Sequence, residues 1–232
     1  METAILKRPG DPQSQGTTRV CIDCNNGWMS RLQQAAKPVL LPLIQGDPTR
    51  LSRQNQRLVA RWATMSVMTS DFIDPNKQAV PIEDRRQFSK TGEPPADTWK
   101  IWIGRFQRQE WRGYWVHNSI PIGDNEEELG VTEEGHPHPN TQTTTLVFGE
   151  LYVHAFSCPY PEIVRPVELS DRATSVLTQI WPVQHENVTW PSGMMSDRDA
   201  DTMAGEIFAH LDYIWRTTQG WEDPPPFEYS GS

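Results

Sequence analysis

The stretch RQNQRLVARWATMSVMTSDF, residues 53–72, predicts the central helix of this chain. Its apolar side chains recur at three- and four-residue spacings, which is the period of a helix face. The stripe consists of Leu58, Val59, Trp62, Ala63, Met65, Val67, Met68 and Phe72. A stripe this wide is typical of a helix buried in a core, so Met65 and Met68 are interpreted as core filler.

Two further helices flank this segment. Residues 26–46 show helical spacing, with Gly46 as the terminator and with Pro38 and Pro42 expected to kink or split the helix. A short helix is predicted over 82–90, and a short strand over residues 19–21.

The pattern then changes to the two-residue period of strands. Strands are predicted over 99–104, 113–120, 143–157 and 177–183, with Gly149 as a turn or bulge in the third. Ser196 and Asp199 form a capping-box-like start for a helix to about residue 215. The predicted class is α+β: an N-terminal helical part, an antiparallel sheet and a closing C-terminal helix.

The predicted organisation has four parts. Residues 1–19 are expected to form a flexible arm, 20–95 the helical region, 96–216 the sheet with its closing helix, and 217–232 a frayed tail. Three cysteines form no disulfide framework, and neither a signal peptide nor an apolar membrane span is evident, so we expect a cytoplasmic protein. The net charge of -9 is uneven, because bases dominate from Lys7 to Arg112 and acids after Asp124.

The segment from Cys21 to Ser30, CIDCNNGWMS, contains the clearest chemical motif. Two cysteines separated by two residues can bind one zinc ion from a tight turn, but a structural zinc site needs four ligands. A second such pair is absent, and Cys158 lies far downstream. We expect free thiols and no cofactor, with zinc at Cys21 and Cys24 as the alternative.

This segment resembles an uncharacterised group of bacterial and phage proteins related to HNH endonucleases. The similarity continues through AKPVLLPLI (36–44), LVARW (58–62), WKIWIG (99–104), GYWVHN (113–118), TTTLVFG (143–149) and QIWP (179–182). The resemblance implies that Cys21 and Cys24 match a zinc pair and that Asn25 or Asn26 matches a metal-binding asparagine. In such enzymes an upstream C-x-x-C and a Glu-His or Asp-His pair supply the other zinc ligands and the general base.

The twenty residues before Cys21 contain no cysteine or histidine. We therefore expect a shortened, non-catalytic relative of HNH proteins that binds a protein or nucleoprotein partner, for example as an inhibitor in phage–host conflict. The alternative is a divergent metal-dependent DNA endonuclease that uses Asn25, Asn26 and His117. The remaining histidines are expected to be structural or solvated.

Basic and aromatic residues alternate between Trp99 and Trp115. Nucleic acid could bind there by base stacking and phosphate contacts from Lys100, Arg105, Arg108 and Arg112. Direct DNA binding through an N-terminal basic surface belongs to the same hypothesis. We favour the simpler interpretation, a sheet with one face in the core and Arg and Lys on the other.

Overall fold

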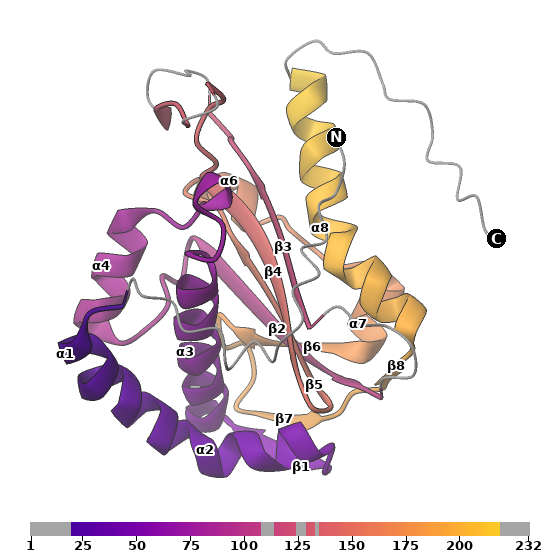
Figure 1. Cartoon of the computed structure of the whole chain (residues 1–232). Coiled ribbons are helices and arrows are strands. Elements are labelled where there is room, and N and C mark those ends of the chain that lie inside the picture. The colour runs from indigo at the N-terminus through magenta and orange to yellow at the C-terminus, as the bar shows by residue number, and fades with distance from the viewer. Residues whose placement is uncertain (1–19, 108–113, 124–128, 133–134, 219–232) are drawn as a thin grey trace.

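The structure, a computed structural model, describes residues 20–107, 114–123, 129–132 and 135–218 (Figure 1). The helical segments are α1 (Ile22–Cys24), the π-helical turn η1 (Asn25–Met29), α2 (Ser30–Gln45), α3 (Arg53–Ser70), the 3-10 turn η2 (Pro75–Lys77), α4 (Ile82–Thr91), α6 (Pro161–Val164), α7 (Asp171–Val176) and α8 (Asp197–Thr218). The strands are β1 (Thr49–Ser52), β2 (Trp99–Phe106), β3 (Trp115–Ile120), β4 (Thr141–Phe148), β5 (Leu151–Ser157), β6 (Leu177–Trp181), β7 (Asn187–Trp190) and β8 (Met194–Met195).

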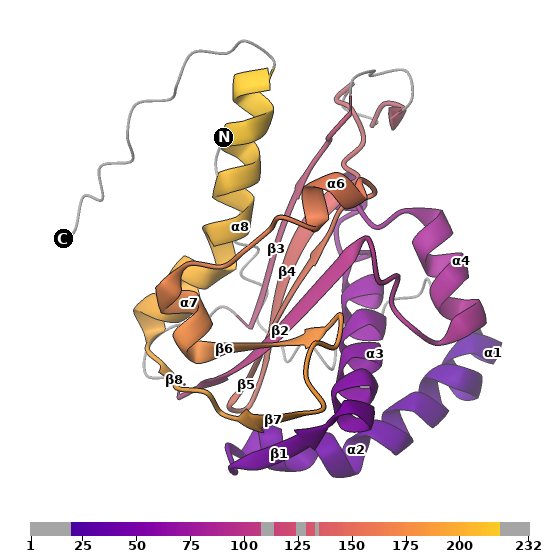
Figure 2. The same ribbon diagram turned by 180° about the vertical axis from the view of Figure 1, so that it is seen from behind.

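The main sheet has the strand order β3-β4-β5-β2-β6, and neighbours on this path are antiparallel. The short strand β8 pairs with the end of β2, in parallel orientation, with Arg105 opposite Met194. Strands β1 and β7 form a separate antiparallel pair. Helices α2, α3 and α4 lie on one side of the main sheet and α8 on the other (Figures 1 and 2). The predicted α+β fold is therefore confirmed.

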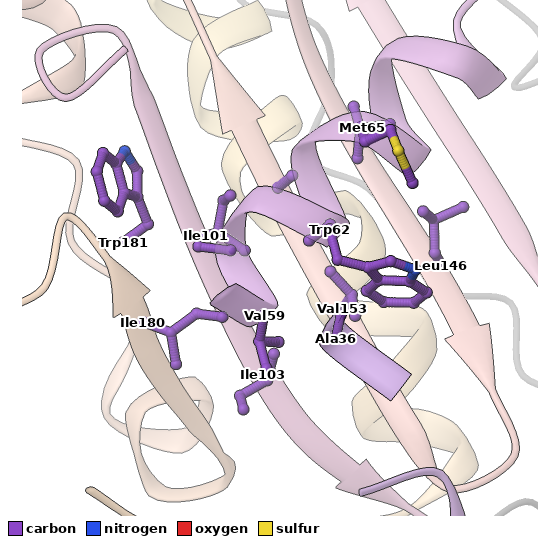
Figure 3. Close-up of a cluster of buried hydrophobic side chains, with 14 of the residues drawn as sticks. Ala36, Val59, Trp62, Met65, Ile101, Ile103, Leu146, Val153, Ile180 and Trp181 are labelled. Carbon is purple, nitrogen blue, oxygen red and sulfur yellow. The ribbon is translucent and has the colours of Figure 1, made fainter. Parts of the chain in front are cut away.

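Helix α3 is the main contact between the helical layer and the sheet. Its side chains Val59, Trp62 and Met65 face sheet residues such as Ile101 and Val153 (Figure 3). Fully burying an aliphatic or aromatic side chain contributes about 1.5–3 kcal/mol, so this stripe is a large share of the stability. The helix starts where the Ser52 hydroxyl accepts a hydrogen bond from the Asn55 backbone N–H at 3.3 Å.

One buried apolar cluster extends from Leu32 in α2 to Trp190 in β7. It contains residues of both the 20–95 region and the 96–216 region, so the two regions pack around a shared core. In the described parts of the chain, no helix has the length and apolar content that crossing a bilayer requires.

Helix α8 covers the second face of the sheet. Its buried residues Met203 and Ile207 belong to a cluster with Trp102 and Tyr152. The prediction that one face presents Arg and Lys to solvent is therefore wrong. Alternating strands have two distinct faces, and here each face has its own helical cover.

Two local predictions about this part of the chain need correction. Pro38 and Pro42 do not split helix α2, and the non-helical backbone falls at Gly27, where φ is -93° and ψ is -112°. Pro38 is exposed and Pro42 half-buried, so the carbonyls that lose a donor lie toward the solvent side. Residues 20–21 form no strand, because Cys21 caps the start of α1. Gly46 ends α2 in the left-handed conformation, as predicted.

The turn between β4 and β5 joins the sheet to the end of α2. The backbone N–H of Glu150 donates to the Ile44 carbonyl at 2.9 Å, and the Glu150 carbonyl accepts from Phe106 at 2.9 Å. The Glu150 carboxylate accepts from Nε of Arg105 at 2.6 Å. Gly149 lies so close to α2 that an added Cβ would come within 2.3 Å of the Ile44 carbonyl oxygen.

We predict that Gly149→Ala lowers the free energy of unfolding by about 3 kcal/mol, because a side chain meets both the positive φ of 58° and the Ile44 carbonyl. The matched variant Gly205→Ala, in α8 with nothing within 4 Å of its Cβ position, should gain about 0.5–1 kcal/mol. Urea unfolding followed by tryptophan fluorescence measures both changes. Equal effects of the two substitutions would contradict the tight packing of this turn.

Candidate functional site

The Cys21–Cys24 pair lies at the start of the helical layer. Cys21 is exposed and Cys24 is partly buried, and both are free thiols. The backbone N–H of Cys24 donates to the Cys21 sulfur at 3.1 Å, and the N–H of Asn25 donates to the Cys21 carbonyl at 2.9 Å. These bonds place both sulfur atoms within a single turn, as the C-x-x-C spacing predicts.

Trp28, four residues after Cys24, links this turn to helix α4. Its ring packs edge-to-face on Phe88 of α4 at a centroid distance of 5.6 Å. Hydrogen bonding with Cys21, followed by burial, raises the pKa of the Cys24 thiol, whereas the Trp28 indole acts to lower that pKa. The neighbouring Cys21 sulfur thus disfavours ionisation of Cys24.

The cysteine pair fits half of a zinc site. Two thiolates satisfy two of the four positions of tetrahedral zinc. Across residues 20–107, 114–123, 129–132 and 135–218, no group of three or more His, Cys, Asp or Glu side chains could hold a metal ion. Cys158 is 1% exposed within the core beneath α8. A complete zinc site would therefore need ligands beyond the described residues of a single copy.

His117 is buried on β3 and engaged at both ring nitrogens. Nε2 lies 2.9 Å from the Lys77 carbonyl, and Nδ1 lies 2.8 Å from the Thr144 hydroxyl. Because a carbonyl only accepts, Nε2 carries a proton. Burial lowers the pKa of His117. The Thr144 hydroxyl donates to the Gln142 side-chain oxygen, so the contact between Nδ1 and Thr144 belongs to a buried chain of polar groups.

The structure does not bring His117 together with Asn25 and Asn26. The two asparagines are exposed directly after α1, which lies at the outer end of the helical layer, whereas β3 is part of the sheet (Figures 1 and 2). The constellation expected for the nuclease alternative is thus not assembled from these three residues.

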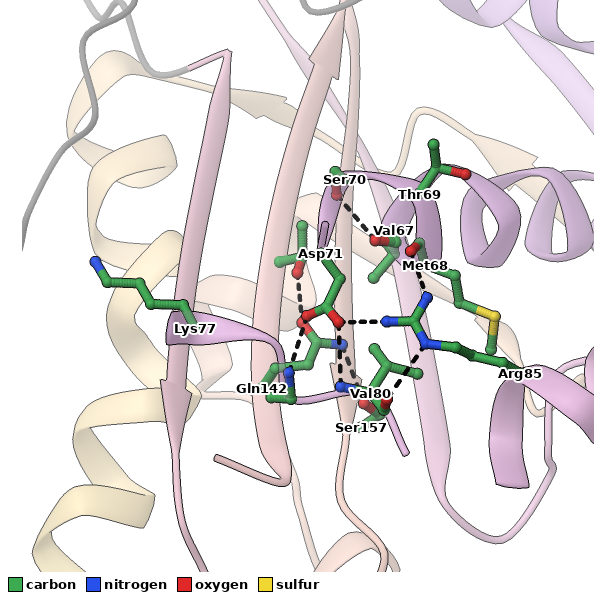
Figure 4. A network of polar contacts seen from close by, with 12 residues as sticks. Val67, Met68, Thr69, Ser70, Asp71, Lys77, Val80, Arg85, Gln142 and Ser157 are labelled. Carbon is green, nitrogen blue, oxygen red and sulfur yellow. Dashed lines mark hydrogen bonds and ion pairs between the residues drawn. The ribbon is translucent and has the colours of Figure 1, made fainter. Parts of the chain in front are cut away.

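Asp71 is the centre of a buried polar network beside His117 (Figure 4). Its carboxylate accepts from the backbone N–H groups of Ala79 and Val80 at 3.1 and 3.4 Å, and it contacts the guanidinium of Arg85. Oδ1 also lies 3.5 Å from Nε2 of His117. Burial raises the pKa of Asp71.

This network acts as a structural clamp. Arg85 also donates to the Met68 carbonyl at 2.6 Å, which ties α4 to the end of α3. The connector after α3 is thereby fixed to both α4 and β3. Sequence reasoning missed this cluster, because Asp71, Arg85 and His117 share no periodic spacing.

His154 is a second buried histidine, on the α8 side of the sheet. Its Nδ1 lies 2.9 Å from the Thr145 hydroxyl, and its Nε2 has no hydrogen-bond partner among the described residues. Burial lowers the pKa of His154 to about 4. The folded protein therefore contains His154 in its neutral form. This buried environment is consistent with the expected structural role.

The basic residues proposed for nucleic-acid contact are engaged within the fold where they are described. Lys100 Nζ donates to the carbonyls of Arg165 and Val167 at 3.0 and 2.7 Å, and Arg105 pairs with Glu150. The interleaved Trp99 and Trp102 are buried, whereas Arg108 and Arg112 lie outside the described residues. Nucleic-acid binding through this set stays a prediction.

Comparison with protein-family models, with curated proteins and with solved structures finds no match to this chain. The resemblance to HNH-related proteins therefore stays a prediction as well.

We predict that stability falls as the pH drops from about 6.5 to 4. Below pH 6.5 the unfolded chain binds a proton at His154, whereas the folded chain does so only near pH 4. This difference lowers the free energy of unfolding by about 3 kcal/mol in total. His117 contributes in the same direction. Urea unfolding across this range should show that His154→Gln removes much of the slope, whereas the exposed His185→Gln keeps it. A wild-type slope in His154→Gln would contradict this assignment.

Proposed function

We propose that this protein acts by binding a protein or nucleoprotein partner without cutting nucleic acid, and that the partner docks on the tip formed by Cys21, Ile22 and Cys24. The observation that carries this proposal is the exposure of Ile22, at 76%. Covering this apolar side chain, which lies between two cysteines in the sequence, would favour association with a partner.

The state of His117 supports binding over catalysis. A general base in phosphodiester cleavage must reach a water molecule and accept its proton. Here Nε2 is protonated toward the Lys77 carbonyl, and Nδ1 faces Thr144 inside the core. The resemblance to HNH proteins then accounts for the ancestry of the CIDCNNGWMS segment, with the cysteine turn retained as a docking element.

The distribution of charge indicates the partner. Acidic residues dominate after Asp124, and the net charge is -9. An acidic surface favours association with a basic protein groove, including one that otherwise holds nucleic acid. Inhibition of a nucleic-acid-targeting complex in phage–host conflict is a role of this kind.

The first test is DNA cleavage. Purified protein should leave duplex and single-stranded DNA intact in the presence of Mg²⁺, Mn²⁺ or Zn²⁺, as judged by gel electrophoresis. Metal-dependent cutting that Asn25→Ala abolishes and the exposed control Asn187→Ala preserves would overturn the proposal and establish the endonuclease alternative.

The second test is partner capture from the native host. Ile22→Asp should reduce recovery of the bound partner at least about tenfold, because it places a charge in the apolar contact. Met194→Asp is the matched control, since Met194 is 42% exposed on β8, away from α1 (Figures 1 and 2). Both variants should keep the wild-type melting temperature. Equal recovery with both variants would place the docking surface elsewhere.

A further inference from the structure

The cysteine tip supplies two metal ligands that the rest of the described chain does not complete. The Cys24 N–H bond to the Cys21 sulfur holds the thiols on one side of a single turn. Groups of three or more metal-binding side chains are missing from the part of the chain that the structure describes. The third cysteine of the sequence, Cys158, is enclosed in the other core cluster.

A two-fold axis would complete such a half-site without any further ligand type. In an isologous dimer each copy presents the same patch, so two ligands from one copy become four ligands around the axis. Four thiolates in a tetrahedron are a common structural zinc site, with Zn–S distances of about 2.3 Å.

We propose that Cys21 and Cys24 of two copies of this chain bind one zinc ion and thereby form a dimer. The partner copy supplies half of the site, and neither copy alone holds zinc tightly.

The surroundings of the thiols suit a second copy. Ile22 lies between the two cysteines in the sequence and is 76% exposed, so an approaching copy would cover it. The apolar contact adds to the metal bonds, which fix the geometry.

The non-helical backbone at Gly27 separates the tip from α2. An added Cβ at Gly27 would meet nothing within 4 Å.

This inference rests on the docking surface of the proposed function and names a second copy of this chain as an occupant of it, so that a second copy and another partner would compete for Ile22. The two can fail separately, because dimer formation is measured on purified protein without DNA or any host component. Loss of the zinc dimer would leave partner capture as an independent result.

The experiment uses the full chain, stripped with EDTA, kept reduced with a phosphine, and titrated with ZnSO₄. Bound zinc is measured by elemental analysis and mass by sedimentation velocity. We expect one zinc per two chains, a dimer that appears with zinc, and a return to monomer on adding EDTA.

Three variants test the assignment of ligands and surface. Cys21→Ser and Cys24→Ser should each weaken zinc-dependent dimerisation at least about a hundredfold, because each removes two of four ligands from the dimer. Ile22→Asp keeps the ligands and should weaken the dimer about tenfold. Met194→Asp should behave as wild type, and circular dichroism confirms that each variant is folded.

Several outcomes would overturn the proposal. These are a monomer that binds no zinc, a monomer with one zinc per chain, and a dimer that EDTA leaves intact. A dimer that only a reductant dissolves would indicate a disulfide in place of zinc and would also overturn it.

Discussion

The backbone bond between Glu150 and Ile44 fixes the end of α2 against the sheet on which α3 packs. The β4–β5 turn uses a carbonyl at the end of α2 that the helix itself leaves without a donor. Arg105 and Phe106 of β2 bind the same turn. The two-residue loop thus joins the β4–β5 hairpin to α2 and β2. It leaves little room for a side chain at position 149, because Gly149 lies against the backbone of α2.

The described polar residues of the centre differ from the tip in exposure. The sheet is covered on both faces, so its buried polar residues form hydrogen bonds within the protein. Asp71, His117 and Arg85 hold a connector in place, and His154 is enclosed under α8. By contrast, the Cys21 turn precedes the backbone break at Gly27 and is exposed to approaching molecules.

Sequence periodicity was sufficient to predict α3, because burial on a 3.6-residue repeat leaves a direct imprint on the residues. It was insufficient for β1 and β7, whose four-residue strands pair across the length of the chain. The cover of the second sheet face was also mispredicted, since polar atoms of Lys100 find carbonyl partners inside the fold. For the candidate site, the C-x-x-C spacing predicted the thiol turn, but the confinement of His117 depends on contacts with Lys77 and Thr144 from other elements.

Strand β2 has a consequence for the order in which the molecule can assemble. It pairs with β5, β6 and β8, all of which follow it in the chain. During synthesis the sheet that covers the apolar side of α3 is therefore incomplete until strands β5 (Leu151–Ser157) and β6 (Leu177–Trp181) have been made. Such non-local pairing slows folding and leaves apolar surface exposed while the chain is still on the ribosome. The newly made chain thus exposes the apolar face of α3 until both of these strands have been synthesised.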